Sequence, residues 1–135
     1  MLQANINYLA VFVAAVVYMV IGALWYSPVL FGRTWQKLVG PHRDNLRGNA
    51  ANGYGLTFVA ALLIAYVLAH FVDYLGADTV LAGAQLGFWL WAGFSITTGV
   101  GETIFAGRPG KLYVLNMTYN LVAIVVMAAI LATWM

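Results

Sequence analysis

Four apolar runs, each long enough to cross a membrane, are separated along the chain by three shorter polar segments. The runs cover about residues 6–26, 54–72, 81–105 and 112–134. A helix rises about 1.5 Å per residue and the hydrocarbon core of a bilayer is about 30 Å thick, so about 20 apolar residues make one crossing. The pattern predicts an all-α, polytopic membrane protein, with four transmembrane helices in one domain over residues 1–135.

The polar segment after the first run contains a shorter amphipathic pattern. Phe31, Trp35 and Leu38 fall at i, i+4 and i+7, whereas Arg33 and Lys37 fall on another face. This spacing predicts a short amphipathic helix lying in the membrane interface, with its apolar side in lipid. The alternative is an irregular loop whose long side chains snorkel towards water.

The first run ends in residues that are typical of the headgroup level. Trp25 and Tyr26 are amphipathic aromatic residues, which gather at the membrane–water interface. Pro28 disfavours a helical backbone at Ser27. We therefore expect the first transmembrane helix to end here, with Trp25 and Tyr26 at the interface.

Composition supports a lipid-facing chain. Of the 135 residues, 64% are apolar and 7% are charged, and the mean hydropathy is +0.88. Soluble domains carry about 25% charged residues, because their surfaces face water. Cysteine is absent from the sequence, which excludes disulfides, thiol nucleophiles and cysteine metal sites. We expect contact with the lipid bilayer, no nucleic-acid partner, no cofactor and no metal.

The basic residues are confined to two alternate loops. The first loop contains Arg33, Lys37, Arg43 and Arg47, and the third contains Arg108 and Lys111. Loops rich in lysine and arginine stay on the cytoplasmic side. The sequence therefore predicts a multi-pass membrane protein with both termini on the outer side.

Polar residues on the third and fourth runs come to similar depths. Glu102 and Asn116 are almost equally far from the turn that joins these runs, and so are Thr98 and Asn120. Tyr113 shares one face of the fourth helix with the two asparagines. The spacing predicts a polar seam between helices three and four.

Glu102 is the only acidic residue within the predicted spans, and two roles are open for it. The first is a proton-titrating or ligand-binding carboxylate, since an ionisable group at membrane depth is a functional-site hypothesis. The second, which we favour, is a clasp between helices, in which Asn116, Tyr113 or Arg108 satisfies Glu102. Polar contacts of this kind contribute about 0.6–2 kcal/mol each.

Other residues of the spans have a structural and a functional interpretation. Gly83 and Gly87 form a small-xxx-small pair that allows another helix to approach closely. Trp89 and Trp91 could line a ligand cavity, but packing against a neighbouring helix or facing lipid is favoured. For His70, an interfacial hydrogen bond is favoured over a metal or proton-relay role, since no ligand set accompanies it.

Two motifs resemble an uncharacterised bacterial membrane family, the domain of unknown function seventeen sixty-one. The first is the stretch GALWYSPVLFG at residues 22–32, with Trp35 and Lys37 after it. The second is IFAGRP at residues 104–109, and residues that match the family follow it: Lys111, Leu112, Asn116, Tyr119, the stretch at 127–131 and Trp134. The family often has an acidic residue directly before the position of Gly107, where this chain has Ala106. The resemblance implies a small four-helix protein of the bacterial inner membrane, and it implies no activity and no catalytic residues.

Three classes of function remain open from the sequence. The favoured one is a non-catalytic binding or assembly component that self-associates or joins a larger membrane complex. The alternative is a small proton-coupled transporter using Glu102. A membrane enzyme is disfavoured, because the predicted spans offer no nucleophile–base pair and no metal-ligand spacing.

Overall fold

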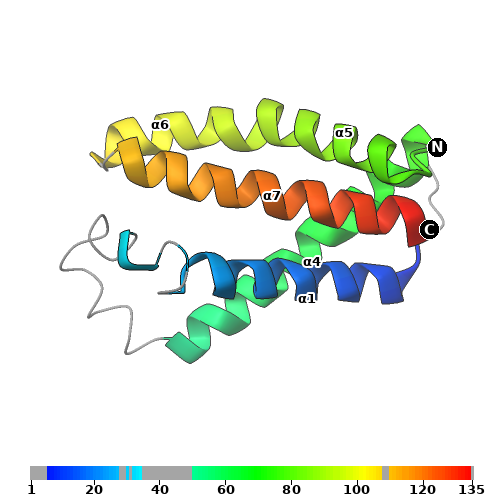
Figure 1. The fold of residues 1–135 in the computed structure, drawn as a ribbon, viewed down its shortest axis with the longest axis horizontal. Coiled ribbons are helices and arrows are strands. Elements are labelled where there is room, and N and C mark those ends of the chain that lie inside the picture. The colour runs from blue at the N-terminus through cyan, green and yellow to red at the C-terminus, as the bar shows by residue number, and fades with distance from the viewer. Residues whose placement is uncertain (1–5, 28–29, 31, 35–49, 108–109, 135) are drawn as a thin grey trace.

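The computed structural model of the 135-residue chain describes residues 6–27, 30, 32–34, 50–107 and 110–134. It confirms the all-α prediction, with four helical segments long and apolar enough to cross a membrane. The third crossing consists of two α-helices joined by a π-helical turn (Figure 1). The elements are α1 (Tyr8–Trp25), α4 (Ala50–Leu75), α5 (Val80–Leu90), η2 (Trp91–Ser95), α6 (Ile96–Ala106) and α7 (Gly110–Trp134).

Local sequence signals explain where these helices begin and end. Asn7 precedes α1, and its side-chain oxygen accepts a hydrogen bond from the backbone N–H of Ala10 at 3.2 Å. Thr79 caps α5 in the same way. Gly107 ends α6 with a φ of 67°, a left-handed conformation that glycine adopts without strain.

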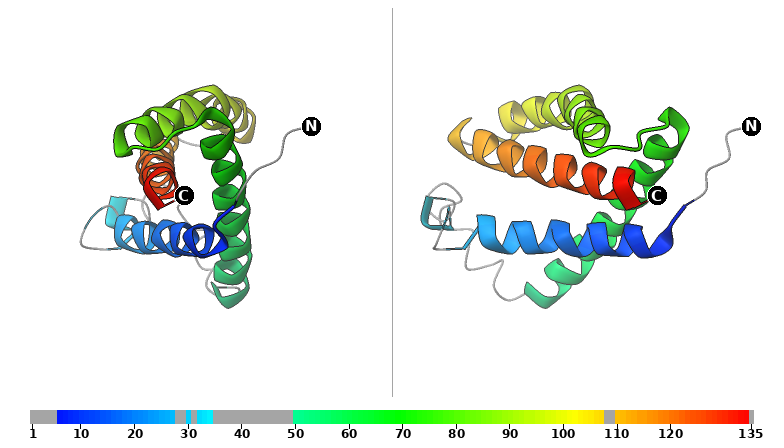
Figure 2. Two further views of the ribbon diagram at one scale, coloured as in Figure 1. Left: turned by 90° about the vertical axis from the view of Figure 1, so that its right-hand side faces the viewer. Right: turned by 45° about the vertical axis from the view of Figure 1, so that its right-hand side comes forward.

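Helix α7 is the central element of the bundle. It packs against α1, α4 and α5, and its N-terminal half also meets α6 (Figures 1 and 2). Nine of its residues are buried, which are Leu112, Leu115, Tyr119, Ala123, Ile124, Met127, Ala128, Leu131 and Ala132. Many of the α7 positions that are not buried, such as Val114 and Val122, are apolar as well, which explains why α7 shows little amphipathicity in sequence.

The most extensive helix contact in the described part of the chain joins α5 to α7, and two glycines allow a close approach there. A Cβ atom at Gly83 would lie only 2.6 Å from the carbonyl oxygen of Ala128, and one at Gly87 would lie 3.0 Å from that of Ile124. Both glycines are buried. The pair predicted from sequence to pack helices therefore packs the third crossing against the fourth.

Helix α4 crosses the bundle obliquely, so it lies close to α1 in one half of the bundle and apart from it in the other (Figures 1 and 2). In the half where α1 begins and α7 ends, small residues bring α1 and α4 together, with Ala10, Ala14, Ala65 and Ala69 fully buried. We call this the closed half. Towards the end where α1 stops and α7 begins, the N-terminal part of α4 diverges from the other helices. This second part is the open half.

After α1 the chain folds back on itself at the open end. Gly32 donates its backbone N–H to the carbonyl oxygen of Ser27 at 2.8 Å, and residues 32–34 form a short helix. The structure thus confirms a short helix after the first span. Phe31, Trp35, Lys37 and Leu38, on which the amphipathic pattern depends, lie outside the described residues, as does Arg108.

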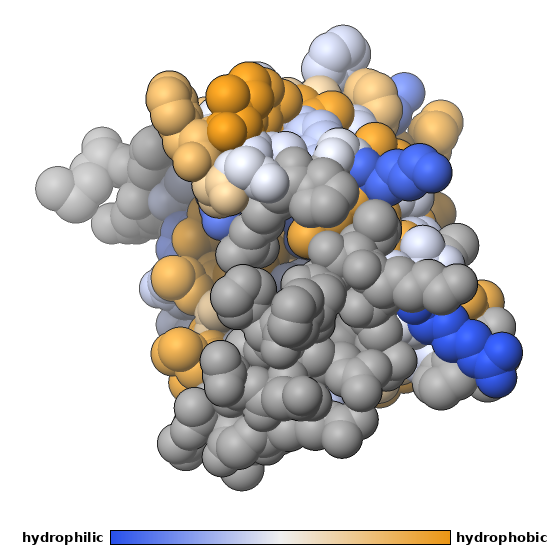
Figure 3. All heavy atoms as spheres, turned by 90° about the vertical axis from the view of Figure 1, so that its left-hand side faces the viewer, coloured by the Kyte–Doolittle hydropathy of each residue, from blue (hydrophilic) through white to orange (hydrophobic). Residues whose placement is uncertain are grey.

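The two ends of the bundle differ in charge. Arg33 and Lys111 are both exposed at the open end, where Figure 3 shows strongly hydrophilic side chains bordered by apolar ones. Asp73 and Asp78 are exposed at the opposite end, around the connection from α4 to α5. Apart from Glu102, an acid in the last turns of α6 at the open end, the described charges are therefore separated along the long axis of the molecule.

Candidate functional site

A wide groove separates α1 from the N-terminal part of α4 in the open half. It encloses about 1020 Å³ and is open on one side. The walls come from α1 and α4, and Tyr119 of α7 reaches it from behind. Its lining residues are Val16, Tyr18, Met19, Val20, Gly22, Ala23, Tyr26, Tyr54, Gly55, Thr57, Phe58 and Tyr119. We call this feature the α1–α4 groove.

The groove ends where aromatic pairs close the contact between α1 and α4. Phe12 meets Phe58 edge-on, with ring centroids 6.0 Å apart. One turn closer to the start of α1, Tyr8 stacks on Tyr66, with ring centroids 6.4 Å apart. Beyond these pairs lies the alanine-rich contact of the closed half. The groove therefore penetrates about half of the bundle and does not run through it.

A cluster of aromatic side chains forms the wall of the groove towards α7. The ring of Tyr119 lies 5.4 Å from Tyr18, 5.4 Å from Tyr26 and 6.2 Å from Trp25, measured between ring centroids. Its hydroxyl donates a hydrogen bond to the backbone oxygen of Tyr18 at 3.0 Å. This hydroxyl also occupies the space beside Gly22, where a Cβ atom would lie 2.8 Å from it. These contacts fix α1 against α7 in the open half.

A second hydrogen bond joins the same two helices closer to the open end. The Tyr26 hydroxyl donates to the Oδ1 atom of Asn116 at 2.6 Å. Asn116 is half-buried, and Tyr26 also lines the α1–α4 groove. Asn116 was predicted to belong to the seam between helices three and four, but its side chain accepts a hydrogen bond from helix one.

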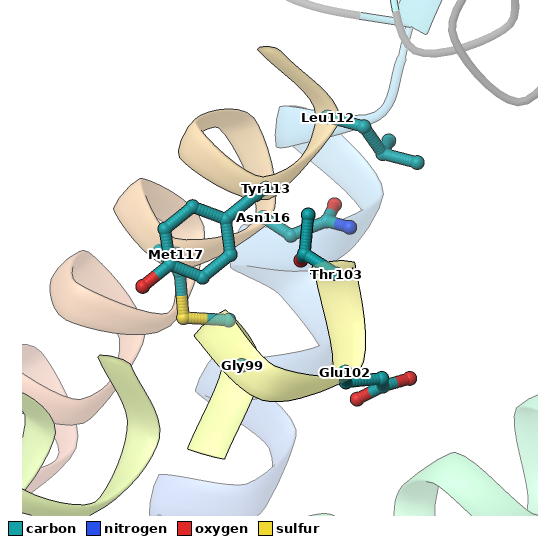
Figure 4. A pocket seen from close by; sticks show the side chains of 7 residues that line it. All are labelled: Gly99, Glu102, Thr103, Leu112, Tyr113, Asn116 and Met117. Atoms are coloured by element: carbon teal, nitrogen blue, oxygen red, sulfur yellow. The ribbon is translucent and has the colours of Figure 1, made fainter. Parts of the chain in front are cut away.

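Glu102 and Asn116 line the same small pocket between α6 and α7, as their predicted depths require (Figure 4). The pocket holds about 60 Å³, which is room for a few water molecules. Its other lining residues are Gly99, Thr103, Leu112, Tyr113 and Met117. In Figure 4 the Glu102 carboxylate points away from Asn116 and out of the pocket. Glu102 is exposed, and no residue in the described part of the chain donates a hydrogen bond to it.

The remaining residues of the predicted seam have partners of their own. Thr98 donates its hydroxyl to the carbonyl oxygen of Phe94, one turn earlier in the same crossing, at 2.7 Å. Tyr113 does bridge the two crossings, because its hydroxyl donates to the carbonyl oxygen of Ile96 at 2.7 Å. Asn120 is half-buried on the same side of α7 as Asn116. Among the described residues of the predicted seam, Tyr113 is therefore the one that bridges the two crossings, and the clasp through Glu102 stays a prediction.

The two central tryptophans and His70 have distinct positions. Trp91, at the start of the π-helical turn, donates its indole N–H to the carbonyl oxygen of Met117 at 2.9 Å, whereas Trp89 is 70% exposed on the outer surface. The Nδ1 atom of His70 lies 2.8 Å from the carbonyl oxygen of Tyr66. Within the described ranges, no three histidine or acidic side chains gather as a metal site would need.

The groove and its aromatic wall were not predicted from the sequence, although one signal was present. Tyr18, Gly22, Trp25 and Tyr26 recur at helical spacing on α1. Gly22 lies between large aromatic residues on one face of α1, which indicates that a side chain from another helix packs against it. That side chain is Tyr119. The oblique course of α4, which leaves the groove open, has no such signal.

Comparison with known proteins identifies a family but no characterised relative. Residues 9–132, which omit only the first residue of α1 and the last two of α7 from the helices described above, match the family described as "Protein of unknown function (DUF1761)". Searches of curated proteins and of solved structures found no significant match. The matched region covers nearly the whole chain, including the walls of the groove, the aromatic cluster and the Glu102 pocket. The protein is therefore a multi-span membrane protein by the length and hydropathy of its helices, and a member of the DUF1761 family.

Proposed function

We propose that this protein is a non-catalytic binding component of a bacterial inner membrane and that the α1–α4 groove is its binding surface. The volume and the lining of the groove are the observations that support this proposal. Small-molecule sites are concave, mostly apolar and about 300–1,000 Å³ in volume, and a groove of about 1020 Å³ lies at the upper end of that range. Its apolar walls and few hydroxyl groups suit an apolar or amphiphilic ligand.

The distribution of small residues favours the groove over the glycine pair as the place where a partner binds. Gly83 and Gly87 are already covered by α7, so they offer no face to a second chain. In the groove, by contrast, Val20 is 51% exposed and Tyr54 is 69% exposed. Self-association or membership of a larger complex would therefore place a partner segment against α1 and α4.

The non-catalytic part of the proposal rests on the residues of the spans. Glu102 and His70 are the only acid and the only histidine in the four predicted spans. His70 belongs to α4 near the α5 connection, whereas Glu102 lies in the last turns of α6 next to the opposite end of the bundle. A general base must lie within hydrogen-bond reach of the group that it activates.

The test is to fill the groove and measure what remains bound. Ala23 is exposed and lines the groove, so Ala23→Trp should fill it without disturbing buried residues. Ala60→Trp is the matched control, because Ala60 is exposed on α4 and does not line the groove. Both variants and the parent chain are purified in mild detergent, and the molecules that co-purify are quantified by mass spectrometry. We expect a bound molecule in the parent and in Ala60→Trp and its loss in Ala23→Trp; equal amounts in all three would contradict the proposal.

A second candidate is the small proton-coupled transporter, and the position of Glu102 favours it over a purely structural role. The carboxylate points away from α7 and has no hydrogen-bond donor among the described side chains and backbone groups. It lines a pocket with room for water. A carboxylate with no hydrogen-bond donor among the described residues is available to exchange a proton or to bind a cation.

Transport is tested with variants that remove one carboxylate each. Glu102→Gln keeps the size of the side chain and removes its titration, and Asp78→Asn does the same at the connection between α4 and α5. The measurement is uptake of the lipophilic cation tetraphenylphosphonium into proteoliposomes with an imposed pH gradient. If the protein is a transporter that uses Glu102, the parent chain and the Asp78→Asn variant should both take up the cation. A stably folded Glu102→Gln variant should take up none. Equal uptake with and without protein would leave binding as the only function.

A further inference from the structure

The α1–α4 groove is longer along α1 than along α4. On α1 its lining residues extend from Val16 to Tyr26, whereas on α4 they extend only from Tyr54 to Phe58. At 1.5 Å per residue these stretches rise about 15 Å and about 6 Å. Helix α4 therefore contributes little more than one helical turn to the groove, which suits a compact occupant better than a long chain or a helix.

Aromatic rings make up much of the lining. Five of the twelve described lining residues are aromatic, which are Tyr18, Tyr26, Tyr54, Phe58 and Tyr119. Helices α1 and α7 supply three of these rings and α4 supplies two. The ring of Tyr119 is inclined by 55° to that of Tyr18 and by 69° to that of Tyr26. A molecule in the groove thus meets aromatic rings that differ in orientation and come from both walls.

Few hydrogen-bond donors remain for a ligand. Tyr26 and Tyr119 already donate their hydroxyls to acceptors on α7 and α1, and Thr57 donates to the carbonyl oxygen of Gly53 at 2.7 Å. Among the residues that the structure describes, no charged side chain lines the groove. An anion would therefore find no basic partner there, and a strongly polar molecule would find few donors. What the groove offers is apolar surface and aromatic rings.

Aromatic rings distinguish between ligands of different charge. The face of a ring is the negative part of its quadrupole, so it attracts a cation that lies within about 6 Å of the ring centroid. This attraction is strongest where water is excluded. A cation whose charge is surrounded by apolar groups is weakly hydrated and also gains from the apolar walls. An anion of the same shape is repelled by the ring faces.

Because the groove is short, rich in aromatic rings and lined by no charged side chain in the described part of the chain, we infer that it binds a compact lipophilic cation. Quaternary ammonium and phosphonium ions with apolar substituents belong to this class. The inference rests on the proposed binding function and specifies the chemical class of its ligand.

The experiment compares two ions that have nearly the same size and apolar surface but opposite charge. Tetraphenylphosphonium and tetraphenylborate are titrated into the purified full chain in a non-ionic detergent, and binding is measured by calorimetry after subtraction of the heat from empty micelles. The parent chain should bind one tetraphenylphosphonium, and it should bind tetraphenylborate at least tenfold more weakly. One ring contributes about 2- to 30-fold to the affinity for a cation, and the groove has several.

Variants of one tyrosine separate its ring from its hydroxyl. Tyr54→Leu removes an exposed ring of the groove and should weaken the binding of tetraphenylphosphonium about 2- to 30-fold. Tyr54→Phe keeps the ring and should bind like the parent. Tyr74→Leu is the matched control, because Tyr74 is exposed on the same helix and does not line the groove. An equal loss in Tyr54→Leu and Tyr54→Phe would show that the hydroxyl binds the ligand, which contradicts the inference.

Other outcomes would overturn the inference and leave the proposed function standing. Equal affinity for the two ions, lost in Ala23→Trp and kept in Ala60→Trp, would mean that the groove binds apolar molecules of any charge. If neither ion binds the parent, the cation is the wrong ligand, whereas a co-purified molecule that is lost in Ala23→Trp would still support the binding function.

The remaining outcomes concern the place where the cation binds. Binding that is lost in Glu102→Gln and unchanged in Tyr54→Leu would place the cation at the carboxylate and refute its placement in the groove. Affinity for tetraphenylphosphonium that is the same in the parent, Ala23→Trp and Tyr54→Leu would also refute the groove as its site. The proposed function fails separately, when the amount of co-purified molecule is the same in the parent, Ala23→Trp and Ala60→Trp.

Discussion

The contact between α5 and α7 allows the sharpest test of the packing, through the substitution Gly83→Ala. The added Cβ atom would lie 2.6 Å from the carbonyl oxygen of Ala128 and 2.9 Å from the Cα atom of Ala129. Both are backbone atoms of α7, so no flexible side chain can move aside. The two helices would have to separate by several tenths of an ångström, which loosens the contact around the new methyl group.

A matched substitution in the same crossing isolates the packing cost. Gly101 belongs to α6, and a Cβ atom there would have no neighbour within 4 Å. Both Gly→Ala changes gain up to about 1 kcal/mol of helix propensity, and this gain cancels when the two variants are compared. Overpacking costs about 1–3 kcal/mol. Gly83→Ala should therefore have a free energy of unfolding about 1–3 kcal/mol lower than Gly101→Ala.

The assay is reversible unfolding by sodium dodecyl sulfate in mixed micelles, followed by tryptophan fluorescence. Relative to Gly101→Ala, the predicted difference raises the unfolding equilibrium constant about 5- to 150-fold. Gly87→Leu, one turn further along α5, should be destabilised at least as strongly. If Gly83→Ala and Gly101→Ala unfold at the same detergent fraction, the close approach of α5 and α7 does not exist and the reasoning fails.

The other predictions concern topology, the contact between α1 and α7, and the π-helical turn. A reporter active only in the periplasm should be active when fused after Met135 and inactive when inserted at Asn49, because the basic loops stay cytoplasmic; the reverse pattern would disprove the predicted orientation. Tyr26→Phe removes the hydroxyl that donates to Asn116 and should lower the free energy of unfolding by about 1 kcal/mol. The measurement uses the same micelles, and an unchanged free energy would mean that water replaces the phenol hydroxyl. Trp91→Phe loses the hydrogen bond to the Met117 carbonyl and should destabilise the protein more than Trp89→Phe at its exposed position, which the same unfolding curves would show.

The number and approximate limits of the spans could be predicted from the sequence, because they depend on local composition, although α4 runs from Ala50 to Leu75 and so extends beyond the predicted span of about 54–72 at both ends. A run of about 20 apolar residues has to be helical in a bilayer, since every backbone group needs an internal hydrogen bond there. Capping residues such as Asn7 and Thr79 then fix the ends. The π-helical turn at residues 91–95 could not be predicted, because it adds no charge and little polarity to the run.

The depth of Glu102 could be predicted, but its direction could not. Counting residues from the turn placed Glu102 opposite Asn116, and the two do line one pocket. Gly99, three residues earlier, is the position that faces α7, since its Cβ would lie 2.9 Å from the Tyr113 ring. Three residues correspond to a rotation of about 300° around a helix with 3.6 residues per turn. Glu102 is therefore rotated about 60° away from the contact, and spacing along the sequence holds no information on this angle.

The position of the groove follows from where the chain places its small and its large residues. At the closed end, α1 and α4 meet through alanines that are fully buried, so their backbones can approach each other. Beyond the Phe12–Phe58 pair the facing residues include large side chains such as Tyr18 and Tyr54, and Tyr54 on α4 remains 69% exposed. In lipid, apolar side chains gain little by leaving the solvent, so helices stay together only where packing is close. The closed half thus holds α1 and α4 together, and the open half keeps an apolar surface that only a molecule from the bilayer or a partner chain can cover.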